Sequence, residues 1–137
     1  MQVSTRTRYG LRALLDIAEQ GGERPVLLRE IADRQEISKP YLEQVILTLQ
    51  SAGFVRSIRG KKGGFFLSKS PSEIKLNEVV KALERSVSLV ECVNDAGVCS
   101  RSPNCATRQL WVRLTDLMQT ELERLTLEDL MNYDKEK

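Results

Sequence analysis

The sequence of 137 residues contains no histidine. Histidine titrates near neutral pH and is the commonest nitrogen ligand of metals, so its absence excludes Ser-His and Cys-His nucleophile pairs and imidazole-held metal sites. No phosphate-cradling motif is present either, because GKKGG (60–64) lacks the P-loop spacing. No apolar run is long enough to span a membrane, and the N-terminal pattern suits an amphipathic helix better than a signal peptide. We therefore expect a cytoplasmic protein that is not an enzyme.

Cysteine is scarce, and its three copies lie in one polar stretch, ECVNDAGVCSRSPNCA (91–106). In a reducing cytoplasm, Cys92, Cys99 and Cys105 favour a metal, cluster or redox site over disulfides. Three ligands are one short of a closed zinc site, and no CxxC pair is present, so an iron-sulfur cluster completed by a ligand from elsewhere fits better than zinc. Unrelated surface cysteines and a reversibly oxidised thiol pair remain alternatives.

The composition is that of an ordinary folded protein, with 41% hydrophobic and 29% charged residues. Its length suits one compact domain, or a small domain with an appendage. The formal net charge of +2 indicates no particular partner, but four cations gather without an acid in RSIRGKK (56–62).

Apolar residues recur at helical spacing in five places. These stripes cover residues 11–18, 28–32, 42–49, 76–83 and 110–125. Thr126, three residues before Asp129, predicts the capped start of one short last helix. The segment from Ser68 to Lys75 reads as a linker.

The order of elements predicts a winged helix. RQEIS (34–38) joins the second and third helices, with Ser38 as a favourable N-cap and Pro40 in the first turn. FVRSIR (54–59) and FFL (65–67) flank a glycine-rich turn, which is typical of a two-stranded hairpin. A helix-turn-helix followed by a hairpin is the winged-helix order. We expect a mainly α fold with a small β-hairpin and a long C-terminal helix.

Such a unit binds DNA when its exposed helix face is polar and cations surround it. Glu43 can accept from a cytosine amino group and Gln44 can pair with adenine, while cations on the hairpin can follow the backbone or enter the minor groove. The alternative is a helix pair with no DNA role and a solvated hairpin tip. The candidate DNA contacts are Ser38, Lys39, Tyr41, Glu43, Gln44, Arg59, Lys61 and Lys62.

Over nearly its whole length the chain resembles the Rrf2 family of bacterial transcription regulators. The resemblance lies in TRYGLRALLDIA (7–18), in residues 29–67, in the three-cysteine loop and in LTLEDL (125–130). Its most specific parts are YLEQ (41–44) and RSIRGKKGGF (56–65).

This resemblance implies a winged helix-turn-helix DNA-binding domain in residues 1–75 and a helical dimerisation and sensor region in residues 76–137. The long helix, about Ala106 to Leu125, would pair with its twin in a homodimer that reads a palindromic operator on double-stranded DNA. The three cysteines match the ligands of members that sense cluster status, redox state or nitric oxide.

The chain departs from both known ligand sets of this family. IscR-like members carry a histidine where this chain has Arg108, and NsrR-like members use a carboxylate where this chain has Arg8. Both a [2Fe-2S] and a [4Fe-4S] cluster therefore stay open, as do a cluster-free thiol-redox regulator and a CymR-like regulator controlled by docking on a metabolic enzyme.

Overall fold

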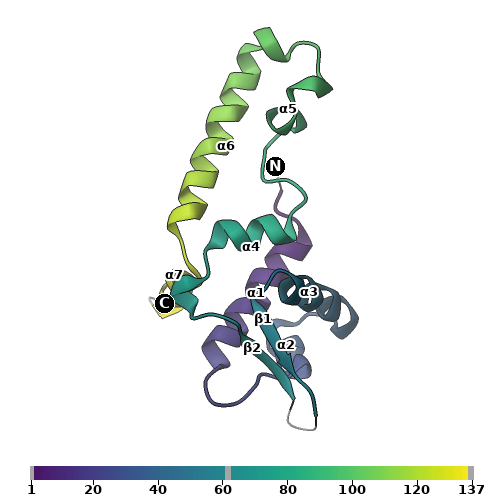
Figure 1. Ribbon diagram of the computed structural model, residues 1–137, viewed down its shortest axis with the longest axis vertical. Helices are drawn as coiled ribbons and strands as arrows, with labels where there is room; N and C mark the ends of the chain where they lie inside the picture. The colour runs from purple at the N-terminus through teal and green to yellow at the C-terminus, as the bar shows by residue number, and fades with distance from the viewer. Residues whose placement is uncertain (1, 61–62, 136–137) are drawn as a thin grey trace.

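Three helices and a hairpin form the first half of the fold, and a long helix dominates the second (Figure 1). The computed structural model describes residues 2–60 and 63–135. The first half holds α1 (Thr5–Gln20), α2 (Leu28–Gln35), α3 (Lys39–Ser51), β1 (Val55–Ile58) and β2 (Gly64–Leu67). The second holds the 3-10 helix η1 (Pro71–Glu73), α4 (Leu76–Leu83), α5 (Glu91–Asn94), the 3-10 helices η2 (Ala96–Val98) and η3 (Ser102–Asn104), α6 (Ala106–Arg124) and α7 (Leu127–Lys135).

The winged-helix order is confirmed. Each of the five apolar stripes lies on a helix, and β1 pairs antiparallel with β2 from Val55↔Leu67 to Ile58↔Gly64. Gly60 adopts a φ of +113° in the turn, a conformation that favours glycine. The carbonyl of Gly60 accepts a hydrogen bond from the backbone N–H of Gly63 at 2.9 Å, which closes the turn.

One hydrophobic core joins the two halves of the chain. α1 packs against α2, α3, α4, β2 and α7. We call these elements, together with β1, the head, and α1 lies at its centre. Gly10 allows the close approach of α4, because a Cβ there would meet the Leu83 side chain at 2.5 Å. The most buried side chains of this core include Leu14, Ile17, Ile31, Leu42, Ile46, Leu49, Ile74, Val79 and Leu127.

The segment from Ser68 to Lys75 does more than link two parts. It contains η1, and the Ile74 side chain is fully buried. The carbonyl of Ile74 accepts from the backbone N–H of Leu127 at 2.9 Å, and Lys75 forms an isolated bridge with Thr126. This segment therefore ties the end of α6 and the start of α7 to the head.

The two expected helix caps turn out differently. Asp129 Oδ2 accepts from the backbone N–H of Thr126 at 2.8 Å, so the predicted cap of the last helix is confirmed. Ser38 does occupy the N-cap of α3, but its side chain makes no capping hydrogen bond. Its hydroxyl is left exposed at the helix start.

A narrow arm projects from the head (Figure 1). α6 forms one side of the arm and packs against α4 and α5. Apolar side chains on α6 remain exposed along one stripe, namely Leu110, Leu114, Leu117 and Met118. No helix among the described residues is long and apolar enough to cross a membrane.

Candidate nucleic-acid interface and cysteine loop

The outward face of α3 is mainly polar, although Leu47 on this helix is 60% exposed. Leu42, Val45, Ile46 and Leu49 are at most 1% exposed, because their i, i+3, i+4, i+7 spacing turns them into the core. The opposite face then carries the predicted contact residues, and Ser38, Lys39, Glu43 and Gln44 are all exposed. An α-helix with such a face fits the width of the major groove.

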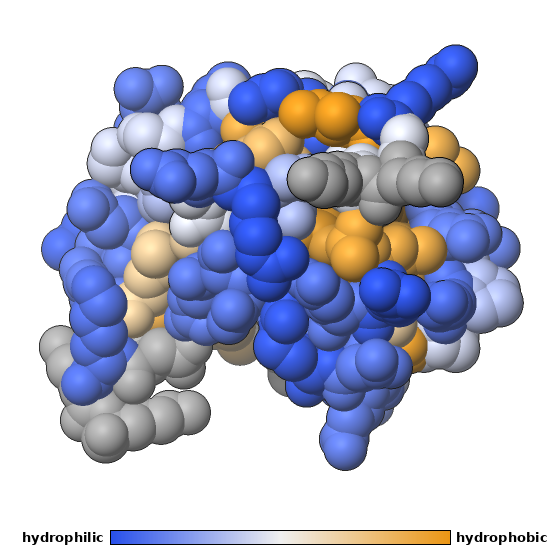
Figure 2. All heavy atoms as spheres, turned by 90° about the horizontal axis from the view of Figure 1, so that it is seen from below, coloured by the Kyte–Doolittle hydropathy of each residue, from blue (hydrophilic) through white to orange (hydrophobic). Residues whose placement is uncertain are grey.

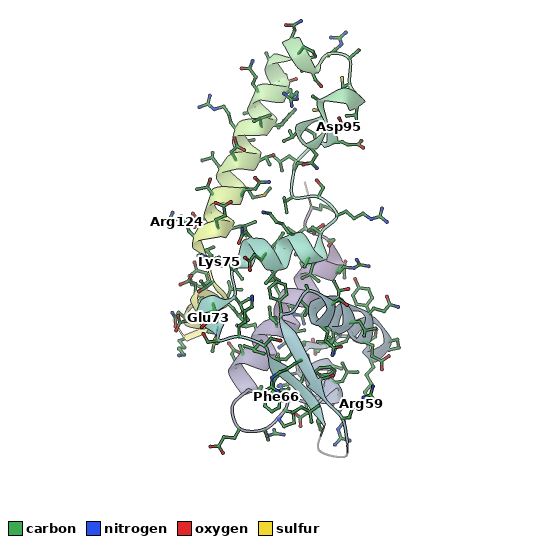
Figure 3. The ribbon with its side chains drawn as sticks, viewed as in Figure 1. Arg59, Phe66, Glu73, Lys75, Asp95 and Arg124 are labelled. Carbon is green, nitrogen blue, oxygen red and sulfur yellow. The ribbon has the colours of Figure 1, made fainter. Side chains whose placement is uncertain are left out.

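The hairpin lies at the lower end of the head, and Arg59 projects beside its tip (Figure 3). Arg59 is exposed, as predicted for a DNA contact, whereas Lys61 and Lys62 lie outside the described residues. On β1, the guanidinium of Arg56 lies over the Phe66 ring, 4.6 Å from its centroid. Seen from this end, the molecule is largely hydrophilic, with a few hydrophobic groups between the polar ones (Figure 2).

The remaining predicted contact, Tyr41, is half-buried and has a structural partner. Its ring meets the ring of Tyr9 edge-on, with centroids 5.7 Å apart and an interplanar angle of 87°. Two arginines of α1 lie over Tyr9, with Arg8 at 5.8 Å and Arg12 at 5.1 Å from the ring centroid. We call Arg8, Tyr9, Arg12 and Tyr41 the Tyr9 stack.

Sequence reasoning overlooked the role of α1 in this surface. The cation three residues after Tyr9 is a local signal, since i and i+3 are neighbours on a helix, whereas Arg8, one residue before Tyr9, has no such signal. Tyr9 and Tyr41 are 32 positions apart in the sequence, so no local pattern predicts their contact.

A buried ion pair fixes α2 against α1. Asp16 is only 2% exposed and accepts three hydrogen bonds, from Arg34 Nη2 at 2.8 Å, Arg34 Nε at 3.0 Å and Gln35 Nε2 at 2.9 Å. The hydrogen bonds that Arg34 donates to the Asp16 carboxylate raise the pKa of Arg34, so the guanidinium remains charged. Arg12 donates from Nε to Gln35 Oε1 at 3.2 Å, which connects this pair to the Tyr9 stack.

The cysteine loop lies at the opposite end of the molecule from the hairpin, as the positions of Asp95 and Arg59 show (Figure 3). All three cysteines are free thiols, and Cys99 is exposed while Cys92 and Cys105 are half-buried. The soft thiolates suit an iron-sulfur cluster chemically. Among the described residues, however, no three Cys, Asp or Glu side chains converge as a metal site requires. The present arrangement of the loop therefore does not fit a cluster.

Cys105 is the N-cap residue of α6 and lines an open hollow with Arg101 and Thr107. Its Sγ lies 3.2 Å from Thr107 Oγ1. This hydrogen bond, together with those from the backbone at Arg108 and Thr107 and the charge of Arg101, lowers the pKa of the Cys105 thiol in spite of some desolvation. A lowered pKa raises the fraction of thiolate, the form that binds metals and reacts with oxidants.

Two hydrogen bonds hold the cysteine loop and the residues just before it against α6. Arg108 donates from Nε to the carbonyl of Cys92 at 3.1 Å. The backbone N–H of Leu89 donates to the buried hydroxyl of Thr115 at 3.3 Å. The arginine at position 108 thus orients the backbone of one cysteine.

Comparisons with known proteins agree over nearly the whole chain. The family described as "Rrf2: Iron-dependent Transcriptional regulator" matches residues 3–133. Protein rrf2 of Nitratidesulfovibrio vulgaris is 43% identical over 131 residues, which is 96% of this chain and 87% of that one. Among solved structures, CymR, the global cysteine regulator of B. subtilis, gives a TM-score of 0.81 at 38% identity and covers 97% of this chain and 98% of its own. IscR of T. potens gives a TM-score of 0.81 at 34% identity and covers 99% and 90%.

Proposed function

The chain belongs to the Rrf2 family of transcriptional regulators, and we propose that it is a DNA-binding regulator whose three cysteines hold an iron-sulfur cluster. In this proposal residues 1–75 bind DNA, and residues 76–137 dimerise and sense the signal. The signal is cluster status, redox state or nitric oxide.

The free polar face of α3 beside the hairpin carries the DNA-binding part of the proposal. The proposed contacts from α3 are Ser38, Lys39, Tyr41, Glu43 and Gln44, and those from the hairpin are Arg59, Lys61 and Lys62. Glu43 and Gln44 read base edges, whereas the hairpin cations meet phosphates.

Binding assays with selected and random duplexes separate these two roles. Glu43→Ala changes the preference among duplexes, whereas Glu78→Ala on α4 leaves it unchanged. The hairpin pair Lys61→Ala with Lys62→Ala weakens all duplexes alike and lowers the salt slope. A uniform effect of Glu43→Ala would argue against base reading.

The exposed apolar stripe of α6 supports a homodimer. Leu110, Leu114, Leu117 and Met118 are 38–67% exposed at i, i+4, i+7, i+8 spacing, so they form one face that a second copy can cover. We expect Leu117→Glu to dissociate the dimer in sedimentation experiments. Val3, which is 60% exposed against 67% for Leu117, serves as the control when it is changed to Glu. A Leu117→Glu protein that stays dimeric would contradict pairing through this stripe.

The clustering of all three thiols in the loop between α4 and α6 supports the sensing part. A cluster supplies a redox-active, oxygen-sensitive group, and Cys92, Cys99 and Cys105 are its proposed ligands. Because the thiols do not converge in this structure, the proposal requires the loop to rearrange on loading.

Anaerobic purification with iron and sulfide analysis and an absorption spectrum tests the cluster directly. Cys99→Ser should abolish the absorption of the bound cluster, and Ser100→Ala should preserve it. A protein that stays colourless and iron-free after anaerobic reconstitution would overturn cluster sensing, while DNA binding would still stand.

Three observations favour a second candidate. The three thiols do not converge among the described residues, the pKa of Cys105 is lowered, and the likeness to CymR is as strong as that to IscR. A cluster-free regulator, controlled by thiol oxidation or by docking on a metabolic enzyme, would bind its operator without iron. Its DNA affinity would then respond to peroxide or to the partner enzyme, and not to cluster removal.

A further inference from the structure

The Tyr9 stack lies directly beside the start of the proposed recognition helix. Tyr41 is the third residue of α3, and its ring contacts Tyr9 on α1. Arg12 donates to the side chain and to the carbonyl of Gln35, the last residue of α2. The Arg12 guanidinium therefore borders the turn that leads into α3, and the Arg8 guanidinium is connected to α3 through the rings of Tyr9 and Tyr41.

The two arginines of the stack differ in their freedom. Arg12 is half-buried, and its hydrogen bonds to Gln35 hold it in place. Arg8 is exposed, and its hydrogen bond to Thr5 Oγ1 is long, at 3.3 Å. Within the described part of the chain, neither arginine forms a salt bridge with a carboxylate. Their charge is thus uncompensated beside a helix whose outward face is polar.

This arrangement suits a phosphate oxygen. A helix that fills the major groove has the two phosphate backbones along its sides, so cations on its flanks meet phosphates and not bases. The cation–π contact with Tyr9, 5.8 Å from the ring centroid, limits the positions of the Arg8 guanidinium, and apart from the long hydrogen bond to Thr5 its donors can meet a phosphate. Such prior ordering reduces the entropy lost when the side chain binds.

We propose that Arg8, held on the ring of Tyr9, binds a DNA phosphate at the edge of the groove that α3 enters, with Arg12 as the positioning residue that fixes the stack to the α2–α3 turn. This inference rests on the proposed DNA binding and adds α1 as a third contact region. It gives the recognition helix an anchor on its α1 side.

Arg6 offers a matched control for Arg8. It is an exposed arginine on the same helix, but its charge acts on Glu84 at the end of α4. Arg8→Gln and Arg6→Gln therefore remove the same charge from the same helix turn, and only the first removes a member of the stack.

The test measures the affinity of the full chain for a duplex selected with the wild-type protein and for a random duplex, over a series of salt concentrations. For each bound subunit, the loss of one phosphate contact lowers the slope of the logarithm of the association constant against the logarithm of the salt concentration by about 1. The same loss weakens the affinity by about eightfold at 0.1 M salt. We expect Arg8→Gln to show this loss equally on both duplexes, so that the ratio between them is unchanged. We expect Arg6→Gln to retain the wild-type slope.

A double-mutant cycle with Tyr9→Leu tests the stack itself. If Tyr9 holds Arg8 in place, the Arg8→Gln change has a smaller effect in the Tyr9→Leu background than in the wild type. Circular dichroism and thermal unfolding verify that each variant is folded. Equal salt slopes for the Arg8→Gln and Arg6→Gln proteins would overturn the inference while leaving DNA binding intact. A wild-type protein that binds neither duplex would instead overturn the proposed function.

Discussion

Removing Arg34 should destabilise the protein strongly, because it leaves Asp16 buried without its ionic partner. Asp16 is 2% exposed and would keep only the hydrogen bond from Gln35 Nε2 at 2.9 Å. Breaking a buried pair on one side costs about 3–5 kcal/mol. The Arg34 side chain is 35% exposed, so water can reach the vacated position and the lower limit applies. We expect Arg34→Ala to lower the free energy of unfolding by about 3 kcal/mol.

The pair Arg24–Glu30 provides the control for this measurement. Its atoms approach to 3.3 Å, but the Arg24 side chain is 69% exposed, so Arg24→Ala should cost at most about 1 kcal/mol. Urea unfolding at one fixed protein concentration measures both variants, since dimer formation would make stability depend on concentration.

A double variant refines the same experiment. Asp16→Asn combined with Arg34→Met removes both charges and should be more stable than Arg34→Ala alone, because no charge is left buried without a partner. Equal losses for Arg34→Ala and Arg24→Ala would refute the reasoning, since they would show that burial of Asp16 adds nothing to the cost.

Three further predictions concern single positions. Glu36, the C-cap residue of α2, has a φ of +55°, a left-handed conformation that favours glycine. Glu36→Gly should therefore raise the free energy of unfolding in urea by about 0.5–1 kcal/mol. A lower free energy of unfolding would show that the Glu36 side chain contributes more than this backbone strain costs. Partial burial raises the pKa of Glu84, but hydrogen bonds from Ser4 and Thr7 and the charge of Arg6 together have the larger, opposite effect. The pKa of this carboxyl is therefore lowered from its ordinary value of 4.5. This carboxylate therefore stabilises the fold above pH 4.5 and less as the pH falls through its lowered pKa, so Glu84→Gln should flatten the acid dependence of unfolding. Thr107→Val should raise the pKa of Cys105 and slow its alkylation by iodoacetamide at pH 7 in metal-free protein, with the rate at Cys99 as the control.

Local patterns in the sequence were sufficient for α1 to α4, α6, α7 and the hairpin, but they did not predict η1 in the expected linker or α5, η2 and η3 in the cysteine loop. The helical stripes need only the 3.6-residue period, and the hairpin needs only β-forming residues around glycines, so both follow from neighbours in the chain. The exposed face of α3 followed in the same way, because burial of Leu42, Val45, Ile46 and Leu49 leaves one orientation for Glu43 and Gln44.

Contacts between distant residues did not follow from such patterns. Ile74 lies in a polar segment that reads as a linker, yet it is fully buried because the chain returns through α7 to the same core. Tyr41 reads as a free contact residue, yet it packs against Tyr9. Both outcomes depend on how helices cross, and the crossing is set by the packing of the whole core.

The amino-acid sequence alone establishes which functional groups this protein has: a helix with a polar face, a basic hairpin, three thiols in one polar loop, and no imidazole. Where these groups lie relative to one another depends on the fold. It put Arg8 and Arg12 over the Tyr9 ring, which packs against Tyr41 of α3, it tied Arg34 to Asp16, and it placed the thiols at the far end of the molecule from the hairpin, without bringing them together. The physical reason is that side-chain chemistry belongs to each residue, whereas proximity depends on the one packing of helices that buries Leu14, Leu42 and Leu127 together.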